Sequence, residues 1–294
     1  MKKNQSIDLL HGPIFKSLSL LAIPIMATYF IQMAYNLVDM LWIGFLGSGA
    51  VASIGVSGNF MYLANGLVNM PKIGSQALVG QSLGANNQEQ TKNYIQAAFQ
   101  SSLFFALIYG IIIIVFQKYL IQLFNLSDPA IIRDAQNYLW ITCGFIVFSF
   151  VNQIFTGILT AAGHSKSTFI ATTTGLVLNL ILDPVLIFVF NLRVIGAALA
   201  TILAQIIVTL VFLYNAKNLD LFRNIRILSK PELNHISEIL KIGFPSSVQS
   251  MLFTCISMYI ARLISSFGAI SVAVQKVGSQ IESISWMAAD GFSA

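Results

Sequence analysis

Four carboxylic acids stand within long apolar stretches of the sequence, namely Asp39, Asp183, Glu282 and Asp290. An ionisable side chain inside a membrane is costly, and it therefore predicts a functional site by default. Asp39 and Asp183 each lie about seven residues before the predicted outer end of an apolar segment, or about 10 Å below the outer surface at 1.5 Å of rise per residue. We therefore expect their carboxyl groups to face one another at equal depth.

Amide and hydroxyl side chains accompany both acids. Asn179 precedes Asp183 by one helical turn, and Tyr35 and Asn36 precede Asp39 by about one turn, so each set shares a helix face. Two carboxylates in a poorly solvated pocket retain a proton, because two like charges disfavour each other. The same oxygen atoms could instead coordinate Na⁺, and the residue types do not choose between H⁺ and Na⁺. The alternative is that each Asp pairs locally without a role in transport.

Glu282 lies about twelve residues into the last apolar segment, roughly 18 Å from its outer end, and we expect it to line a cavity. For the other charged residues within apolar segments, Asp290, Lys72 and Arg262, we expect the charged ends to extend to the lipid headgroups.

Four prolines within apolar segments are candidate hinges. Proline removes a backbone donor and frees a carbonyl group one turn earlier. We expect a bend at Pro184, which directly follows Asp183, and similar kinks at Pro24, Pro71 and Pro245. Prolines are also frequent in membrane helices that do not move, so each kink is a hypothesis of its own.

The composition requires a membrane to surround these elements. Hydrophobic residues make up 56% and charged residues 9% of the 294 residues, with a mean hydropathy of +0.77, whereas soluble domains carry about 25% charged residues. The sequence therefore predicts an all-α polytopic membrane protein. Eight segments are long enough to span a bilayer, which takes about 20 residues: 15–45, 50–80, 93–116, 132–162, 167–190, 194–215, 237–266 and 270–294.

Other classes of protein are excluded by the same residues. The net charge of +5 comes from basic residues scattered between apolar runs, so no nucleic-acid surface is expected. Cys143 and Cys255 lie in apolar segments without a zinc-binding spacing, and we read His11, His164 and His235 as solvated loop residues. We expect no cofactor, and no metal beyond Na⁺ at the acid pair.

The distribution of Lys and Arg predicts the orientation of the chain. Basic residues outside the predicted helices gather mostly on the side that holds the N-terminus and the connection 217–236, which places both in the cytoplasm. The polar start of the chain continues to Lys16 without a cleavage site of small residues, so we expect a retained first helix. We expect a multi-pass protein of the plasma membrane that acts as a monomer.

An internal repeat predicts two lobes. A shift of 221 positions brings Gly47 onto Gly268 and Val51 onto Val272. Because an even number of helices separates the copies, they run in the same direction and form parallel repeats with a cleft between them. We expect a complete N-lobe with six helices in 1–216, a cytoplasmic linker in 217–236 and the first two helices of a second lobe in 237–294. A doubled period of about 440 residues suggests the first two thirds of a longer, C-terminally truncated protein.

Five motifs together resemble the N-lobe of the multidrug and toxic compound extrusion (MATE) transporters. They are NLVDMLWIGFLG (36–47), GQSLGA (80–85), FTGILTAAGHSK (155–166), NLILDPVLIF (179–188) and GAALATILAQ (196–205). The chain is most similar to the bacterial branch that includes the DNA-damage-inducible F proteins, and the resemblance runs from about residue 13 to the end.

The resemblance implies a two-lobe antiporter with about twelve helices. Such a protein exports amphiphilic, often cationic, compounds in exchange for H⁺ or Na⁺ by alternating access. By matching position, Asp39 and Asp183 would bind the cation together with Asn179 and Thr201. The substrate cavity would be lined by Tyr35, Asn36, Tyr138, Asn152 and Glu282.

Two other functions compete with drug export. A flippase for lipid-linked saccharides, from the wider superfamily that includes MATE transporters, would need a cationic groove for pyrophosphate, and Arg262 alone gives little support for one. A membrane-embedded enzyme is disfavoured, because no His-Glu-x-x-His or Gly-x-Ser-x-Gly element occurs in the sequence.

Overall fold

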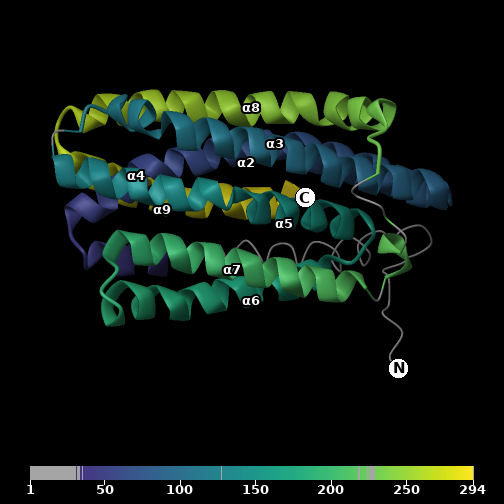
Figure 1. The fold of residues 1–294 in the computed structure, drawn as a ribbon, viewed down its shortest axis with the longest axis horizontal. Helices are drawn as coiled ribbons and strands as arrows, with labels where there is room; N and C mark the ends of the chain where they lie inside the picture. Colours follow the sequence, from purple (N-terminus) through teal and green to yellow (C-terminus); the bar gives the residue numbers. More distant parts are fainter. Residues whose placement is uncertain are drawn as a thin grey trace.

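The structure of the protein is a computed structural model. It describes residues 31, 34, 36–126, 128–217, 219–223, 225 and 229–293, with side chains left out at 269, 280, 284 and 286–293. The regular structure in this part of the chain is entirely helical (Figure 1). In chain order the helices are residues 36–44, α2 (Ser48–Gly84), α3 (Gln88–Gln122), α4 (Pro129–Gly144), α5 (Ile146–Ala161), α6 (Ser165–Pro184), the π-helix η1 (Val185–Val189), α7 (Arg193–Ala216), the 3-10 turn η2 (Asp220–Phe222), α8 (Leu233–Ser265) and α9 (Ala269–Ser293).

Most of these helices are long and apolar enough to cross a bilayer. Within the described residues, α2, α3, α6 with η1, α7 and α8 each qualify, and α4 with α5 qualifies as one span bent by 50°. These six agree with the predicted spans from 50–80 to 237–266 to within a few residues at each end. The predicted span 132–162 is thus a bent pair that breaks at Phe145, next to the weak helix former Gly144.

The remaining two predicted spans fall at the ends of the chain. Most of the predicted span 15–45 lies outside the described residues, and only its last turns are described as helix, at 36–44. The predicted span 270–294 corresponds to α9, which is helical but is not among the helices that qualify as spans.

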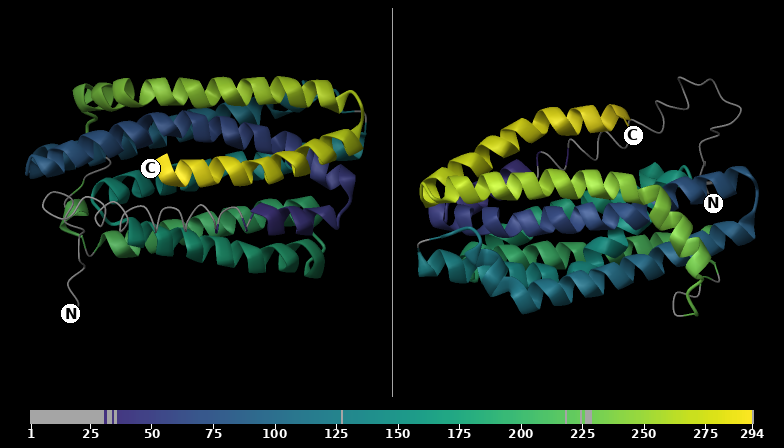
Figure 2. Two further views of the ribbon diagram at one scale, coloured as in Figure 1. Left: turned by 180° about the vertical axis from the view of Figure 1, so that it is seen from behind. Right: turned by 90° about the horizontal axis from the view of Figure 1, so that it is seen from above.

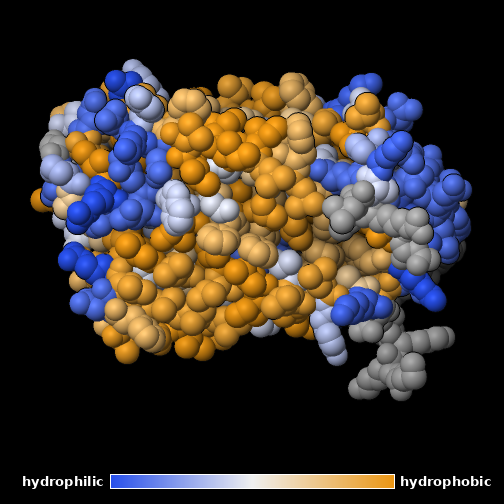
Figure 3. Space-filling model, in the orientation of Figure 1, coloured by the Kyte–Doolittle hydropathy of each residue, from blue (hydrophilic) through white to orange (hydrophobic). Residues whose placement is uncertain are grey.

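The helices form an elongated bundle whose long axis they all follow (Figures 1 and 2). α2 lies at the centre and packs against α3, α4, α5, α8 and α9, while α6 pairs with α7 along one side. On the face shown in Figure 3, hydrophobic residues cover the middle and hydrophilic residues gather towards the two ends of the long axis. This banding is expected for a bundle that crosses a bilayer along its long axis.

The turns before α2 and α9 have the same backbone conformation, in agreement with the internal repeat. Gly47 has a φ of +101° and Gly268 a φ of +99°, a region that favours glycine because it has no Cβ. Their amides donate to Gly44 and Ser265 respectively, each at 3.0 Å. Both turns lie at the same end of the bundle (Figure 1), so the two repeats start their second helices in parallel.

The backbones of α2 and α8 come unusually close near the end of the bundle where α8 begins. A Cβ atom on Gly74 would collide with the carbonyl group of Ile239, and one on Gly243 would collide with that of Met70. Small residues allow membrane helices to approach in this way. Further along the same contact, the amide of Asn69 donates to the hydroxyl of Ser250 at 3.3 Å.

Two expectations for individual side chains are wrong. Lys72 does not extend to the headgroups, because its Nζ donates to Gln153 Oε1 on α5 at 2.8 Å and its stem packs on Gly157. His235 is not a solvated loop residue, because it lies in the first turn of α8 against the ring of Tyr94. Both side chains contact a neighbouring helix, which the order of residues along one helix does not reveal.

His164 lies in the turn between α5 and α6, where we predicted a solvated residue. The structure leaves it only partly exposed, and this desolvation lowers the pKa of its imidazole below the usual range. The imidazole therefore gains its proton only at a lower pH than a fully solvated histidine.

The candidate hinges have different surroundings. At Pro184 the α-helical hydrogen bonding of α6 ends and the π-helix η1 begins, as expected when proline removes a backbone donor. α2 continues as helix past Pro71, and α8 continues past Pro245. Pro24 lies outside the described residues.

Candidate functional site

Two carboxyl groups from distant parts of the sequence meet inside the bundle. Asp39 lies on the helix of residues 36–44, and Asp183 lies in the last turn of α6, just before the change to η1. Their carboxyl groups are within hydrogen-bonding reach of each other, and Asp183 is fully buried. Because a carboxylate carries no donor, such a bond forms only when one of the two acids holds a proton.

The amide of Asn179 adds oxygen atoms to this acid pair. Its Nδ2 donates to Asp183 Oδ1 at 3.4 Å, one turn along α6. Asn179 Oδ1 and Asp183 Oδ2 are both buried and receive no hydrogen bond from any described residue. Buried oxygen atoms without donors are costly, and either a proton or a cation between them would remove that cost.

Tyr138 and Thr201 complete the site from two further helices. The hydroxyl group of Tyr138 on α4 is in hydrogen-bonding contact with Thr201 on α7, and both acids act electrostatically on Tyr138. The hydroxyl group of Thr201 also donates to the carbonyl oxygen of Ala197 at 3.0 Å. Four segments of the chain therefore converge on one polar cluster inside an apolar bundle.

Asn152 lies apart from this cluster. Its Nδ2 donates to the backbone and side-chain oxygens of Gln205 at 3.0 and 2.8 Å, and its Oδ1 accepts from Thr209 at 2.8 Å. All three bonds connect α5 to α7, and Asn152 is only 6% exposed. Its amide is therefore fully used in holding two helices together.

The other residues predicted to line the cavity lie at both ends of the described chain. Asn36 lies one turn before Asp39 in the helix of residues 36–44, and Tyr35 lies outside the described residues. Glu282 lies on α9 with an exposed side chain.

Two residues near the acid pair were missed as site residues by the sequence analysis. Lys276 on α9 places its Nζ 5.0 Å from the centroid of the Tyr62 ring on α2. The charge of Lys276 acts on Asp39, and Tyr62 acts on Tyr138. One tyrosine among nine in an apolar sequence carries no signal of its own, and only the packing of α9 on α2 brings the two together.

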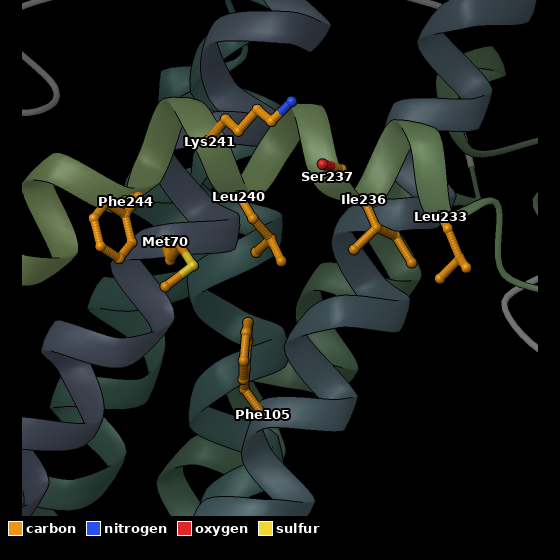
Figure 4. Close-up of a pocket in the computed structure, with 8 residues that line it drawn as sticks. All are labelled: Met70, Phe105, Leu233, Ile236, Ser237, Leu240, Lys241 and Phe244. Carbon is orange, nitrogen blue, oxygen red and sulfur yellow. The ribbon is translucent and has the colours of Figure 1, made fainter.

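A separate apolar groove of about 710 Å³ lies between the first turns of α8 and the helices α2 and α3. Figure 4 shows its lining, in which Ser237 and Lys241 are the polar members. The remaining lining residues are Met70, Phe105, Leu233, Ile236, Leu240 and Phe244. The groove shares no residue with the acid pair, so it is not the cation site.

A bundle of apolar spans that brings an acid pair together beside hydroxyl and amide oxygens defines a polytopic membrane protein with a polar cluster in its interior. The family model MatE matches residues 24–185, more than half of the sequence. The chain therefore belongs to the MatE family, as the five motifs predict. The relatives that the chain matches are named as transport proteins and not as enzymes.

The relatives of the chain include proteins named for drug export. It is 26% identical over 279 residues to the multidrug export protein MepA of Staphylococcus aureus, covering 93% of this chain and 61% of that protein. It is 27% identical over 286 residues to the probable multidrug resistance protein NorM of Thermotoga maritima, covering 95% and 61%. The chain thus spans about three fifths of the length of these curated relatives.

A solved structure supports the fold. The crystal structure of a MATE protein in complex with MaD3S matches with a TM-score of 0.86 and 23% identity, over 99% of this chain and 66% of that chain. At this identity the match concerns the fold alone. The predicted all-α, polytopic, MATE-like architecture is confirmed.

Proposed function

We propose that the protein containing this chain is a secondary active antiporter of the plasma membrane. It exports amphiphilic, often cationic, compounds in exchange for H⁺ or Na⁺ by alternating access. The observation that carries this proposal is the pair of the half-buried Asp39 and the fully buried Asp183, in which Asp183 Oδ2 and the adjacent Asn179 Oδ1 receive no hydrogen bond from the described residues. The names of the relatives from S. aureus and T. maritima support drugs as the exported class.

The coupling cation would bind between Asp39 and Asp183, with Asn179 and Thr201 as additional oxygen donors. Binding of H⁺ or Na⁺ neutralises the like-charge repulsion between the two acids, and release restores it. Because the four groups come from three helical segments, the helix of residues 36–44, α6 and α7, a change in their charge alters how those helices pack. This links cation binding to a change of conformation.

The lobes would provide the route for the substrate. We assign residues 1–216 to the N-lobe, 217–236 to a cytoplasmic linker and 237–294 to the start of the second lobe, with the N-terminus in the cytoplasm. The substrate cavity would lie between the lobes and include Tyr138, Asn36, Tyr35 and Glu282. We retain Pro24, Pro71, Pro184 and Pro245 as candidate hinges of the helices that must move.

The test is efflux of ethidium from vesicles that carry the full-length protein, driven separately by a proton gradient and by a sodium gradient. We expect one gradient to drive efflux, and Asp39→Asn and Asp183→Asn each to reduce it at least about tenfold, because each removes a cation-binding charge. Asp220→Asn is the matched control, since the Asp220 side chain is 99% exposed in η2.

Two results would contradict the proposal in different ways. Efflux that is unchanged in both Asp variants would show that the acid pair is structural. Absence of efflux under either gradient would instead favour the lipid-linked saccharide flippase, which moves its substrate without removing ethidium from vesicles.

A further inference from the structure

The side chain of Lys276 lies along the surface of α2. A Cβ atom on Gly55 would be 3.6 Å from Lys276 Cγ, and one on Gly58 would be 3.7 Å from Lys276 Nζ. The two glycines lie one turn apart on α2 and have no side chains, so they leave a shallow groove, called here the track, along which the aliphatic part of Lys276 extends from α9. A side chain larger than hydrogen at either position would narrow this track.

At the end of this track the ammonium group of Lys276 lies next to an aromatic ring. Lys276 Nζ lies 5.0 Å from the centroid of the Tyr62 ring, within the range at which a cation is attracted to the ring face. The Asp39 carboxyl group also experiences the charge of Lys276. The ammonium group therefore lies in the electrostatic field of both an aromatic face and the half-buried Asp39.

An aromatic face beside a carboxylate is a recognition site for an organic cation, because the ring supplies dispersion and quadrupole attraction and the acid supplies charge. A lysine side chain resembles such an organic cation, because it carries an ammonium group on an apolar stem. We propose that Lys276 is an internal cation that occupies an organic-cation site on the Tyr62 ring, and that an external cation must displace it. This inference rests on the proposed antiport function and assigns a specificity-determining residue to it.

The consequence is discrimination by charge. A cationic substrate at the Tyr62 ring has to displace or repel Lys276, whereas a neutral amphiphile meets no such repulsion. Lys276 comes from α9, after the predicted linker, while Tyr62 and Asp39 come from before it. Displacement of the lysine therefore removes an attraction between the two predicted lobes, and it connects cation binding with their separation.

The experiment measures equilibrium binding to the purified full-length protein in detergent, without any gradient. The probes are ethidium, an aromatic cation, and Nile red, a neutral aromatic dye. We expect Lys276→Gln and Lys276→Met to bind ethidium about tenfold more tightly than wild type, because the competing charge is gone. Nile red affinity should be unchanged in both, which also shows that the variants are folded.

Further variants separate charge from packing. Lys276→Arg retains the cation and should bind ethidium as wild type does. Adding Tyr62→Leu to Lys276→Gln should abolish the gain, because the ring face is lost. The control is Lys241→Gln, an exposed lysine on α8 in the separate groove, which should leave both affinities unchanged.

The inference is overturned if Lys276→Gln binds ethidium no more tightly than wild type, or if it changes ethidium and Nile red affinity by the same factor. Failure of the proposed function has a different signature. In that case neither gradient drives efflux of ethidium, while the difference in ethidium affinity between wild type and Lys276→Gln persists.

Discussion

Asn152 and Asp183 illustrate two different fates of a buried polar side chain in this bundle. Every polar atom of the Asn152 amide contributes to the connection between α5 and α7. Asp183, in contrast, has an oxygen atom that accepts no hydrogen bond from any described residue. A satisfied buried group stabilises the fold, whereas an unsatisfied one indicates a place for a ligand that the protein binds.

This difference predicts that Asn152→Ala affects stability and not cation binding. The substitution removes the hydrogen bonds that Asn152 makes with Gln205 and Thr209, and we expect the free energy of unfolding to fall by about 1–3 kcal/mol. Thermal unfolding of the purified protein measures this, with Asn59→Ala as control, because among the described residues the Asn59 amide donates to Gly55 of its own helix. A variant with normal thermal stability but weakened ethidium binding would instead place Asn152 in the cavity.

At the scale of elements, the backbones of α2 and α8 come into close contact at two glycines. Gly74 and Gly243 let each backbone approach the carbonyl group of the other helix. The hydroxyl of Ser247 donates to the carbonyl oxygen of Gly66 at 2.8 Å further along this contact. Since α2 and α8 come from different predicted lobes, this surface must open and close if the lobes move relative to one another.

We predict that Gly74→Ala prevents this close approach, because the added Cβ collides with a backbone carbonyl group. The measurement is disulfide formation between cysteines at Asn69 and Ser250, whose side chains lie 3.3 Å apart, in a protein without its native cysteines. We expect crosslinking to fall several-fold with Gly74→Ala and to remain with Gly84→Ala, where a Cβ meets no atom. Equal crosslinking in both would mean that the contact tolerates the methyl group.

At the scale of the whole molecule, the band of apolar surface and the distribution of basic residues predict one orientation in the bilayer (Figure 3). The turns before α2 and α9 lie at the same end of the bundle, as the parallel repeat requires. In the proposed orientation both face outward, and the turn between α2 and α3 faces the cytoplasm.

Cysteine labelling tests this orientation. Single cysteines at Ser48 and at Ser266, both exposed, should react with a membrane-impermeant maleimide in intact cells. A cysteine at Asn86, exposed in the turn after α2, should react only after the membrane is permeabilised. The reverse pattern would invert the orientation, and labelling of Ser48 and Ser266 from opposite sides would contradict the parallel repeat.

The sequence by itself determined the class of protein, the approximate limits of the spans, the repeat and the family. These follow from composition, from the length of apolar runs and from glycine turns such as Gly47 and Gly268, all of which are local properties of the chain. The prediction that Asp39 and Asp183 lie at equal depth also needed only the rise per residue along a helix.

Only the tertiary structure decided which side chains share a surface. Lys276 reaches Tyr62, Lys72 reaches Gln153, and Asn152 is engaged by α7 instead of joining the acid pair. The physical reason is that such contacts depend on the rotation and crossing of helices that are far apart in sequence. A helix pattern gives the depth of a residue, whereas its partner is set by the packing of the neighbouring helix.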